Sequence, residues 1–380
     1  MGQAAHSILS DVVAAARQFS GGSEGLPISP ERTSAGEPIL LAYWPPARTN
    51  SFQSLLYCRG WDYGVATMPV ATFEQLAEVP WAGPMVCHFH WLATIDDDEK
   101  IARFEAVLQT LRAQQRKIVW TVHNVLPHDE LDIAGAVRVR RAIVEAADLV
   151  HVMNERTEDL VTPYFSLAGK RTFQTPHPSY LGSFPDDVSR DEARFQLGLS
   201  PDAKVFLCLG AIQRYKGIEE LIAAARVLAD RRPSLDWALV IAGAGKDEAL
   251  VRSLRMYDDI GGRLSIHPQK IPVEDIPYFF HAADYAVCAY RSSLNSGAAM
   301  LALSFGVPLV APVSVAFDDY LERGAGIGYQ PEEADALTTA LIRAIEADSR
   351  DMCAAAREIA NERRPEVASS AFFEGLIRGV

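Results

Sequence analysis

The sequence predicts an α/β protein made of two similar domains, each built on a parallel β-sheet. Two observations predict this fold class: a length of 380 residues, about twice that of an ordinary domain, and short apolar runs that alternate with helical patterns. The alternation stops once, near residue 180, and then restarts. Short apolar runs between helices are typical of parallel strands covered on both faces. We therefore expect two doubly wound domains that face each other across a cleft.

The first predicted domain spans residues 38–180 and follows a segment, residues 1–37, that is rich in Gly, Ser and Pro and predicts a flexible tail. Residues 98–113 carry apolar side chains three and four positions apart, which is the spacing of an amphipathic helix. The predicted strands are Ile39–Tyr43, Met85–Phe89, Ile118–Val122 and Leu149–Met153. This order of strands and helices predicts a Rossmann-like domain.

The second predicted domain spans residues 181–355, and a proline-rich stretch at residues 175–200 is the expected linker. The final segment, residues 356–380, is rich in Ala, Glu and Arg and predicts a helix that packs back on the first domain. The predicted strands of the second domain are Val205–Gly210, Trp237–Ala242, Leu264–His267, Tyr285–Ala289 and Pro308–Ala311. The two halves therefore predict the same architecture.

The overall charge argues against nucleic acid as a partner. With 36 Lys and Arg against 49 Asp and Glu, the formal net charge is −13, so the protein as a whole repels a polyanion. No run approaches the roughly 20 apolar residues of a membrane-spanning helix, and no cleavable signal opens the sequence. The five cysteines lie far apart, so we expect reduced thiols in a cytoplasmic protein. An amphipathic pattern at residues 7–18 leaves a peripheral contact with the inner face of the membrane open.

A glycine turn with two cations follows the first strand of the second domain. Gly210 is followed by Arg214 and Lys216 just before a helix begins. Flexible backbone, positive charge and a helix N-terminus together suit a diphosphate group. The next strand ends in a second close turn, Gly243 and Gly245, which should lie at the same edge of the sheet. Solvated surface cations, and turns that serve only packing, are the alternatives to a phosphate site.

A run of short polar residues follows the fourth strand of the second domain and precedes an apolar helix. One such residue would suffice as an ordinary helix N-cap, but four lie within six positions, which favours a ligand. The residues of this run expected to contact the ligand are Ser292, Ser293, Asn295, Ser296 and Gly297.

Over about residues 38–375, the sequence resembles the retaining glycosyltransferases of family four, which have the two-domain GT-B fold. The resemblance implies a hexosyltransferase in which Arg214 and Lys216 hold the donor diphosphate and Ile271 and Pro272 contact the nucleotide base. It also implies that the reaction needs no metal and no cofactor besides the nucleotide-sugar co-substrate. The segments that carry the resemblance are Gly210–Gly217, Val240–Gly245, Ile271–Asp284 and Ser304–Pro312.

The sequence departs from the family at its Glu-x7-Glu pair. Aligned on Gly306–Pro308, the two positions hold Ser293 and Leu301. In the family, one of these glutamates grips the ribose and the other lies near the donor sugar. The resemblance therefore does not carry retaining chemistry over to this sequence, and the polar residues from Ser292 to Ser296 are the expected substitutes.

The first half is similar to a bacterial branch of polysaccharide-assembly enzymes, some of which add β-linked mannose from a GDP donor. The similarity implies GDP-mannose as the favoured donor, a UDP-sugar as the alternative, and an inverting reaction. It also implies a glycolipid or an oligosaccharide as the acceptor. The segments that carry it are His88–Trp91, Trp120–His128 and His177–Tyr180.

An inverting reaction needs a side chain that takes the proton of the acceptor hydroxyl. His123, at the end of its predicted strand, is the expected base, with Asp129 or Glu130 as alternatives. His90 and Trp91 offer a sugar ring an apolar plate and a hydrogen-bonding group, although a buried structural role suits each histidine equally well. The residues expected to contact the acceptor are Arg48, Asn50, His88, His90, Trp91 and Asn124.

Two features that suggest a metal have simpler interpretations. Six of the nine histidines lie between residues 88 and 177, but no carboxylate or cysteine accompanies them at ligand spacing. The run Asp96–Asp98 looks like an Asp-x-Asp motif, but it opens a helix, where acidic residues stabilise the helix dipole. We therefore expect helix capping and no metal site.

Together these observations predict a glycosyltransferase that moves a sugar from a nucleoside diphosphate sugar to a hydroxyl group in polysaccharide assembly. A non-hydrolysing nucleotide-sugar epimerase, which also has two such domains, is one alternative. A nucleotide-sugar-binding protein without catalysis is the other, and the missing glutamates suggest it.

Overall fold

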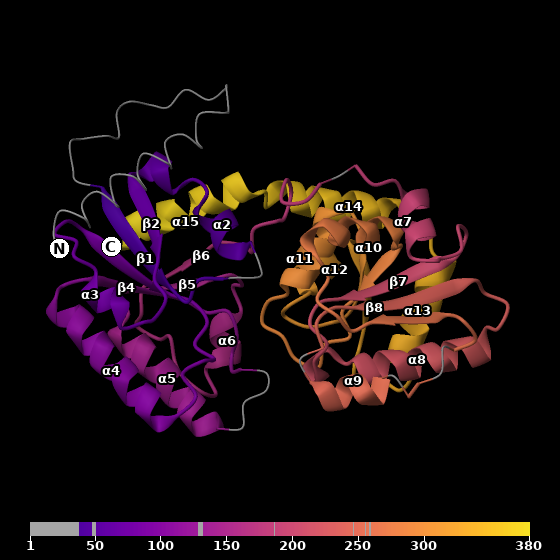
Figure 1. The fold of residues 1–380 in the computed structure, drawn as a ribbon, viewed down its shortest axis with the longest axis horizontal. Coiled ribbons are helices and arrows are strands. Elements are labelled where there is room, and N and C mark those ends of the chain that lie inside the picture. Colours follow the sequence, from indigo (N-terminus) through magenta and orange to yellow (C-terminus); the bar gives the residue numbers. More distant parts are fainter. Residues whose placement is uncertain are drawn as a thin grey trace. The chain divides into compact units, whose positions relative to one another are not determined.

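The computed structural model describes residues 38–47, 51–127, 132–185, 187–245, 247–254, 256–257 and 260–380. The chain divides into two compact units, whose elements are drawn in Figure 1. The first unit holds the described residues up to Val152 together with Val161–Thr175 and Ser369–Val380, and the second holds Met153–Leu160 and Pro176–Ala368. The boundary thus falls after Thr175, not after residue 180, and only residues 369–380 of the expected C-terminal segment join the first unit.

The first unit contains a parallel sheet with the strand order β2-β1-β3-β4-β5-β6. The inner strands are almost wholly buried, which explains why continuous apolar runs predicted them. The edge strands β2 and β6 are partly exposed and carry no such run, so the sequence pattern missed them. The strands are β1 (Ile39–Trp44), β2 (Val65–Pro69), β3 (Met85–Phe89), β4 (Lys117–Thr121), β5 (Leu149–Val152) and β6 (Thr172–Gln174).

Helices cover both faces of this sheet. Helices α4 and α5 pack beside each other on one face, and α15 crosses the other (Figure 1). Neighbouring residues of β3 show the alternation: the ring of Phe89 meets Phe104 of α4 at 5.6 Å, whereas His88 stacks on Phe372 of α15 at 5.4 Å. The helices associated with this sheet are α2 (Phe52–Tyr57), α3 (Gln75–Glu78), α4 (Asp98–Ala113), α5 (Ile133–Ala146) and α15 (Pro365–Gly379), with the 3-10 turn η2 (Gly60–Tyr63). Helix α6 (Thr157–Val161) belongs to the second unit except for its last residue.

The second unit contains a second parallel sheet, with the order β12-β11-β10-β7-β8-β9. Its strands are β7 (Lys204–Leu209), β8 (Trp237–Ala242), β9 (Leu264–His267), β10 (Tyr285–Val287), β11 (Leu309–Pro312) and β12 (Gly326–Tyr329). Its helices are α7 (Arg190–Gln196), α8 (Ile218–Arg231), α9 (Glu248–Leu254), α10 (Ile276–Ala282), α11 (Gly297–Ser304), α12 (Asp318–Glu322), α13 (Ala336–Glu346) and α14 (Arg350–Glu362), with the 3-10 turns η3 (Arg214–Lys216) and η4 (Val273–Asp275). The predicted class, an α/β protein with two Rossmann-like domains, is confirmed.

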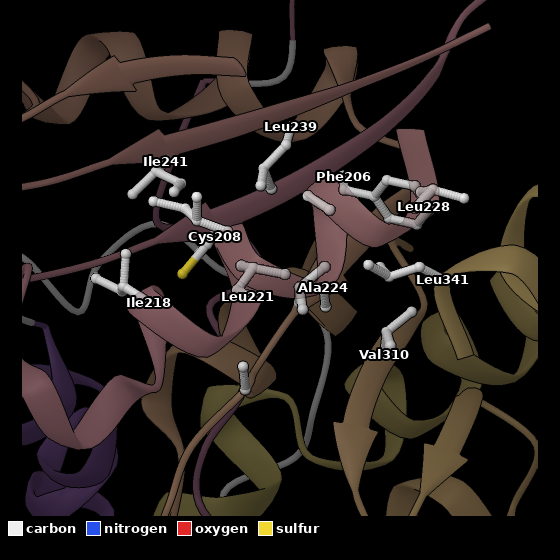
Figure 2. Close-up of a cluster of buried hydrophobic side chains, with 14 of the residues drawn as sticks. Phe206, Cys208, Ile218, Leu221, Ala224, Leu228, Leu239, Ile241, Val310 and Leu341 are labelled. Carbon is white, nitrogen blue, oxygen red and sulfur yellow. The ribbon is translucent and has the colours of Figure 1, made fainter. Parts of the chain in front are cut away.

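The core of the second unit lies between the sheet and helices α8 and α13. Figure 2 shows Leu221 and Leu228 of α8 beside strand residues such as Leu239, with Leu341 of α13 close by. Cys208 is part of this core, and burial raises the pKa of its thiol, so it behaves as a small apolar residue. Cys87 and Cys288 are buried as well.

Two helix starts bear on the sequence predictions. The Oδ1 atom of Asp97 accepts a hydrogen bond from the backbone N–H of Lys100 at 2.7 Å, so the capping interpretation of Asp96–Asp98 is confirmed. Ser189 caps α7 in the same way, inside the stretch expected to be a linker. The guanidinium of Arg194 in α7 is buried against Asp284 at 2.8 Å, which anchors this short helix despite the prolines before it.

Replacing Leu221 by Ala should lower the free energy of unfolding by about 2 to 5 kcal/mol, because the fully buried side chain leaves a cavity between α8 and the sheet. The matched control is Phe195→Ala, since Phe195 is 86% exposed on α7 and its loss should cost less than about 0.5 kcal/mol. Denaturant unfolding measures both values. Equal losses for the two variants would contradict the assignment of the core.

Candidate active site

The carboxyl ends of adjacent strands in the second unit bring the predicted glycine turns together. Gly210 follows β7 with φ +130°, and Gly243 follows β8 with φ +143°. A Cβ atom on Gly243 would collide with the carbonyl group of Gly210, so the two turns touch through bare backbone. The backbone N–H of Gly245 donates to Pro268 at 3.2 Å, which ties the loop after β9 to the same edge.

Lys216 lies within this edge. Lys216 is only 5% exposed, and a Cβ atom on Gly210 would collide with its Nζ atom. The same Nζ lies 5.6 Å from the ring centroid of Tyr290, a cation–π distance. A lysine held this far inside a glycine turn is not a solvated surface cation, which removes one of the alternatives for this residue.

Arg214, at the start of η3, is more accessible. Half of its side chain is exposed, and its guanidinium pairs with Asp247 at 3.0 Å and with Glu219 at 3.5 Å. Exposed ion pairs of this kind contribute about 0 to 1 kcal/mol, so an incoming diphosphate can replace them at little cost. The two predicted cations thus differ: Lys216 is fixed and Arg214 is exchangeable.

Residues of the polar run before α11 also stabilise the local structure. Ser296 is 4% exposed, and its Oγ accepts a hydrogen bond from the backbone N–H of Ala299 at 3.1 Å, which is ordinary N-capping. The Ser293 hydroxyl donates to the carbonyl of Asn295 at 2.7 Å, whereas Ser292 is exposed. The hydroxyl groups of Ser293 and Ser296 therefore make local hydrogen bonds, so fewer hydroxyl groups can contact a ligand than the sequence suggested.

Two side chains that the sequence prediction left out of the site lie against the start of α11. A Cβ atom on Gly297 would stand 3.2 Å from the Tyr180 hydroxyl and 3.4 Å from His177 Nε2. His177 Nδ1 donates to the Pro178 carbonyl at 2.8 Å, so its Nε2 carries the lone pair in the neutral ring. In the sequence, the run His177–Tyr180 carries only a similarity to other enzymes, and nothing in its spacing predicts a contact with Gly297.

Ile271 and Pro272, expected to contact the nucleotide base, follow β9 and lead into η4. Ile271 is half-buried and Pro272 is exposed. Their loop extends the carboxyl edge formed after β7, β8 and β10, so the structure brings all the donor-contacting candidates to one edge of one sheet.

In the first unit, a small cavity of about 20 Å³ lies beside His123, which is enough room for a water-sized group. Trp91 stacks on His123 with a centroid distance of 4.3 Å, and the edge of Phe52 packs against the same ring at 5.0 Å. His123 Nε2 shares a hydrogen bond with His90 Nδ1 at 3.0 Å. The cavity is lined by His90, Trp91, Leu92, Ala93, Trp120, His123, Asn124, Pro127 and Arg140.

His88 does not belong to this cavity, in contrast to its predicted contact with the acceptor. Its side chain is fully buried between the Tyr57 hydroxyl, 2.8 Å from Nδ1, and the Thr121 hydroxyl, 2.7 Å from Nε2. The prediction was wrong for His88 because the strand directs this residue under α15, which the sequence pattern does not reveal. Arg140, a buried residue of α5, also lines the cavity. It was not predicted, because the spacing of apolar residues in a helix does not show that one arginine points into the interior.

Several predicted features lie outside the described residues. These are Arg48 and Asn50, the alternative bases Asp129 and Glu130, and residues 1–37 with their amphipathic pattern. Throughout the described ranges, every helix is too short or too polar to cross a bilayer. Within those same ranges, no three His, Cys, Asp or Glu side chains gather in a way that could hold a metal ion.

Similarity to known proteins accords with this geometry. Residues 203–347, which include the glycine turns, Lys216 and α11, match the family described as Glycosyl transferases group 1. The sequence is 29% identical over 177 residues to D-inositol 3-phosphate glycosyltransferase 1 of Catenulispora acidiphila, a match that covers 45% of this chain and 42% of that protein. The chain thus spans less than half the length of this curated relative. The resemblance to glycosyltransferases expected from the sequence is confirmed for the matched residues.

Solved structures extend the similarity in fold to most of the chain. Sucrose-phosphate synthase from Thermosynechococcus elongatus superposes with a TM-score of 0.70 at 20% identity, covering 90% of this chain and 98% of that one. Anabaena HepE in complex with UDP gives a TM-score of 0.67 at 15% identity, covering 90% of this chain and 100% of that one. The predicted GT-B fold is therefore confirmed.

The buried histidines of the first unit predict a loss of stability in acid. Burial lowers the pKa of His88 and His90 well below the ordinary value and lowers that of His151 to about 3. Their stabilisation is therefore complete above about pH 6.5 and is lost progressively as pH falls below it, because the unfolded chain binds the protons. Each ring that stays neutral at pH 5 should cost about 2 kcal/mol relative to pH 7. Denaturant unfolding at constant ionic strength tests this, and equal unfolding free energies at pH 7 and pH 5 would contradict it.

Proposed function

Because residues 203–347 belong to the group 1 glycosyl transferases, we propose that this chain transfers a sugar from a nucleoside diphosphate sugar to a hydroxyl group of an acceptor. The observation that carries the proposal is Lys216, a buried cation held against Gly210 at the carboxyl edge of the second sheet. Open α/β sheets bind ligands at this edge. A positive charge there favours the diphosphate leaving group as its negative charge develops.

The donor end of the proposal assigns separate tasks to the two cations. Lys216 would contact the diphosphate from its fixed position, and Arg214 would leave Asp247 and Glu219 to form a forked contact with phosphate oxygens. The loop at Ile271 and Pro272 offers an apolar surface to the base. The glycine turns allow the phosphates to approach the backbone closely.

The identity of the donor is a finer part of the proposal. The sequence similarity favoured GDP-mannose, whereas the Anabaena HepE structure is a complex with UDP. We propose a UDP-sugar or GDP-sugar donor, with UDP first because a protein of the same fold over 90% of this chain binds it. The glycolipid or oligosaccharide acceptor, polysaccharide assembly, independence of metals and cofactors, and the cytoplasmic location remain predictions.

At the acceptor end, we propose His123 as the general base. When Nε2 donates to His90, Nδ1 carries the lone pair of the neutral ring, so Nδ1 would take the proton. As the acceptor oxygen forms its bond to the anomeric carbon, the hydroxyl proton moves to Nδ1, and the bond from that carbon to the diphosphate oxygen breaks with its electron pair on oxygen. The Trp91 ring, stacked on His123, gives the sugar an apolar face.

Lys216→Met should weaken binding of UDP and GDP by about tenfold to a hundredfold, because a charged hydrogen bond to phosphate is lost while the length of the side chain is kept. Arg231→Ala is the matched control, since Arg231 stands at the other end of α8 and pairs with Asp335. Titration calorimetry measures the affinities. Equal weakening by the two substitutions, or no nucleotide binding by the parent, would overturn the donor site.

His123→Ala should reduce kcat by about a hundredfold or more with little change in nucleotide affinity, because general bases contribute about 10²- to 10⁴-fold. Turnover within about threefold of the parent would exclude His123 as the base. The assay supplies UDP- and GDP-sugars with glycolipid, oligosaccharide and sugar-phosphate acceptors and follows nucleoside diphosphate release.

The same assay separates the alternatives. A transferase releases nucleoside diphosphate only when an acceptor is present. Isomerised donor in the absence of acceptor would identify an epimerase, and nucleotide binding without turnover on any acceptor would identify a binding protein.

A further inference from the structure

We propose that Tyr57, His88, Thr121 and His151 are positioning residues that act through His90 to set which ring nitrogen of His123 carries a proton. This inference rests on the proposed role of His123 as the base. It assigns a function to buried polar groups that the donor and acceptor contacts do not use.

The side chains form one unbroken series of hydrogen bonds. From His123, the series passes to His90 and then to the Tyr57 hydroxyl, which lies 2.5 Å from His90 Nε2 and 2.8 Å from His88 Nδ1. It continues from His88 Nε2 to the Thr121 hydroxyl at 2.7 Å and from there to His151 Nδ1 at 2.9 Å.

The far end of the series is Thr175, whose hydroxyl lies 2.6 Å from His151 Nε2. Every member is buried, with exposures from 0% for His88, Thr121 and His151 to 9% for His123. We call this series the histidine chain. It runs from the wall of the cavity into the interior of the first unit.

The fold explains how this series forms. Within β3, His88 is directed to the face that α15 covers, and Thr121 of β4 pairs in register with His151 of β5 on that same face. Phe372 of α15 packs against both His88 and His151, at 5.4 Å and 5.1 Å. Apolar cover excludes water, so each ring nitrogen must find its partner inside the protein.

A series of neutral rings and hydroxyls has only two arrangements of its protons, one for each donor-to-acceptor direction along the series. Burial keeps the rings of His88, His90 and His151 neutral, so each has one donating and one accepting nitrogen. Each hydroxyl supplies one hydrogen and bridges two rings. Consequently, once the direction of one hydrogen bond is set, every other bond in the series must point the same way.

The Thr175 end sets that direction. Besides its hydroxyl, the backbone of Thr175 hydrogen-bonds the His151 ring in a way that favours the protonated nitrogen. A backbone carbonyl can only accept, so the nitrogen of His151 that faces Thr175 donates. Followed along the series, this direction makes His123 Nε2 the donor to His90. It leaves His123 Nδ1 with the lone pair that a base requires.

The test uses two pairs of variants. Tyr57→Phe removes one bridging hydroxyl, and Tyr43→Phe is its control, since the Tyr43 ring lies tilted against the Tyr57 ring at a centroid distance of 5.0 Å and is not a member of the series. Thr121→Val removes the other hydroxyl with little change in shape, whereas Thr121→Ser retains it. Each variant is examined as the full chain, with protein labelled with ¹⁵N in histidine.

Nitrogen-15 spectra report the protonated ring nitrogen of His123, whose signals are assigned by their loss in His123→Ala. We expect the proton on Nε2 in the parent, Tyr43→Phe and Thr121→Ser proteins. Tyr57→Phe and Thr121→Val should give mixed protonation and a fall in kcat of about tenfold, with KM within about twofold.

Two outcomes would overturn parts of this account separately. A His123 tautomer that is unchanged in Tyr57→Phe and Thr121→Val would overturn the histidine chain, whatever the kcat. A changed tautomer with unchanged kcat would overturn the role of His123 as the base, and with it the catalytic purpose of the chain.

Discussion

Parallel strands all point the same way, so the loops that follow them meet at one edge of their sheet, and the candidate site of this protein depends on that constraint. In the second unit, the turns after β7 and β8 approach so closely that a Cβ atom on Gly243 would collide with the carbonyl group of Gly210. Lys216 occupies the space that a side chain on Gly210 would fill. The carboxyl edge is thus a narrow backbone turn with a cation inside it, which suits a diphosphate group.

The first unit meets a different constraint, which is the burial of polar rings. Four histidines enter its interior or the wall of its cavity, and each gains a partner through Tyr57, Thr121 or another histidine. Because burial keeps the rings neutral, the hydrogen bonds of the histidine chain all run in one donor-to-acceptor direction, and the chain carries no net charge. Under the proposed role of His123 as the base, stability and catalysis depend on the same hydrogen bonds.

Much of the fold could be predicted from the sequence, since continuous apolar runs mark buried parallel strands such as β3 and β8. Edge strands such as β2 were not predicted, because the alternation of apolar and polar residues in a half-exposed strand is weak. The glycine turn with its two cations could be located from the sequence because Gly210, Arg214 and Lys216 are close together along the chain. The histidine chain was not predicted, because its members come from α2, from β3, β4 and β5, and from the residues that follow β3, β4 and β6. The register of β4 with β5 and the cover of α15 help to bring them together.

The central claim is that the carboxyl edge of the second sheet holds the diphosphate of the donor. A crystal structure of the protein with bound UDP tests it most directly. The account predicts phosphate oxygens within hydrogen-bonding distance of Lys216 Nζ, with the Arg214 guanidinium turned from Asp247 to the phosphates. A diphosphate bound elsewhere on the chain, with Lys216 and Arg214 keeping their present partners, would contradict it.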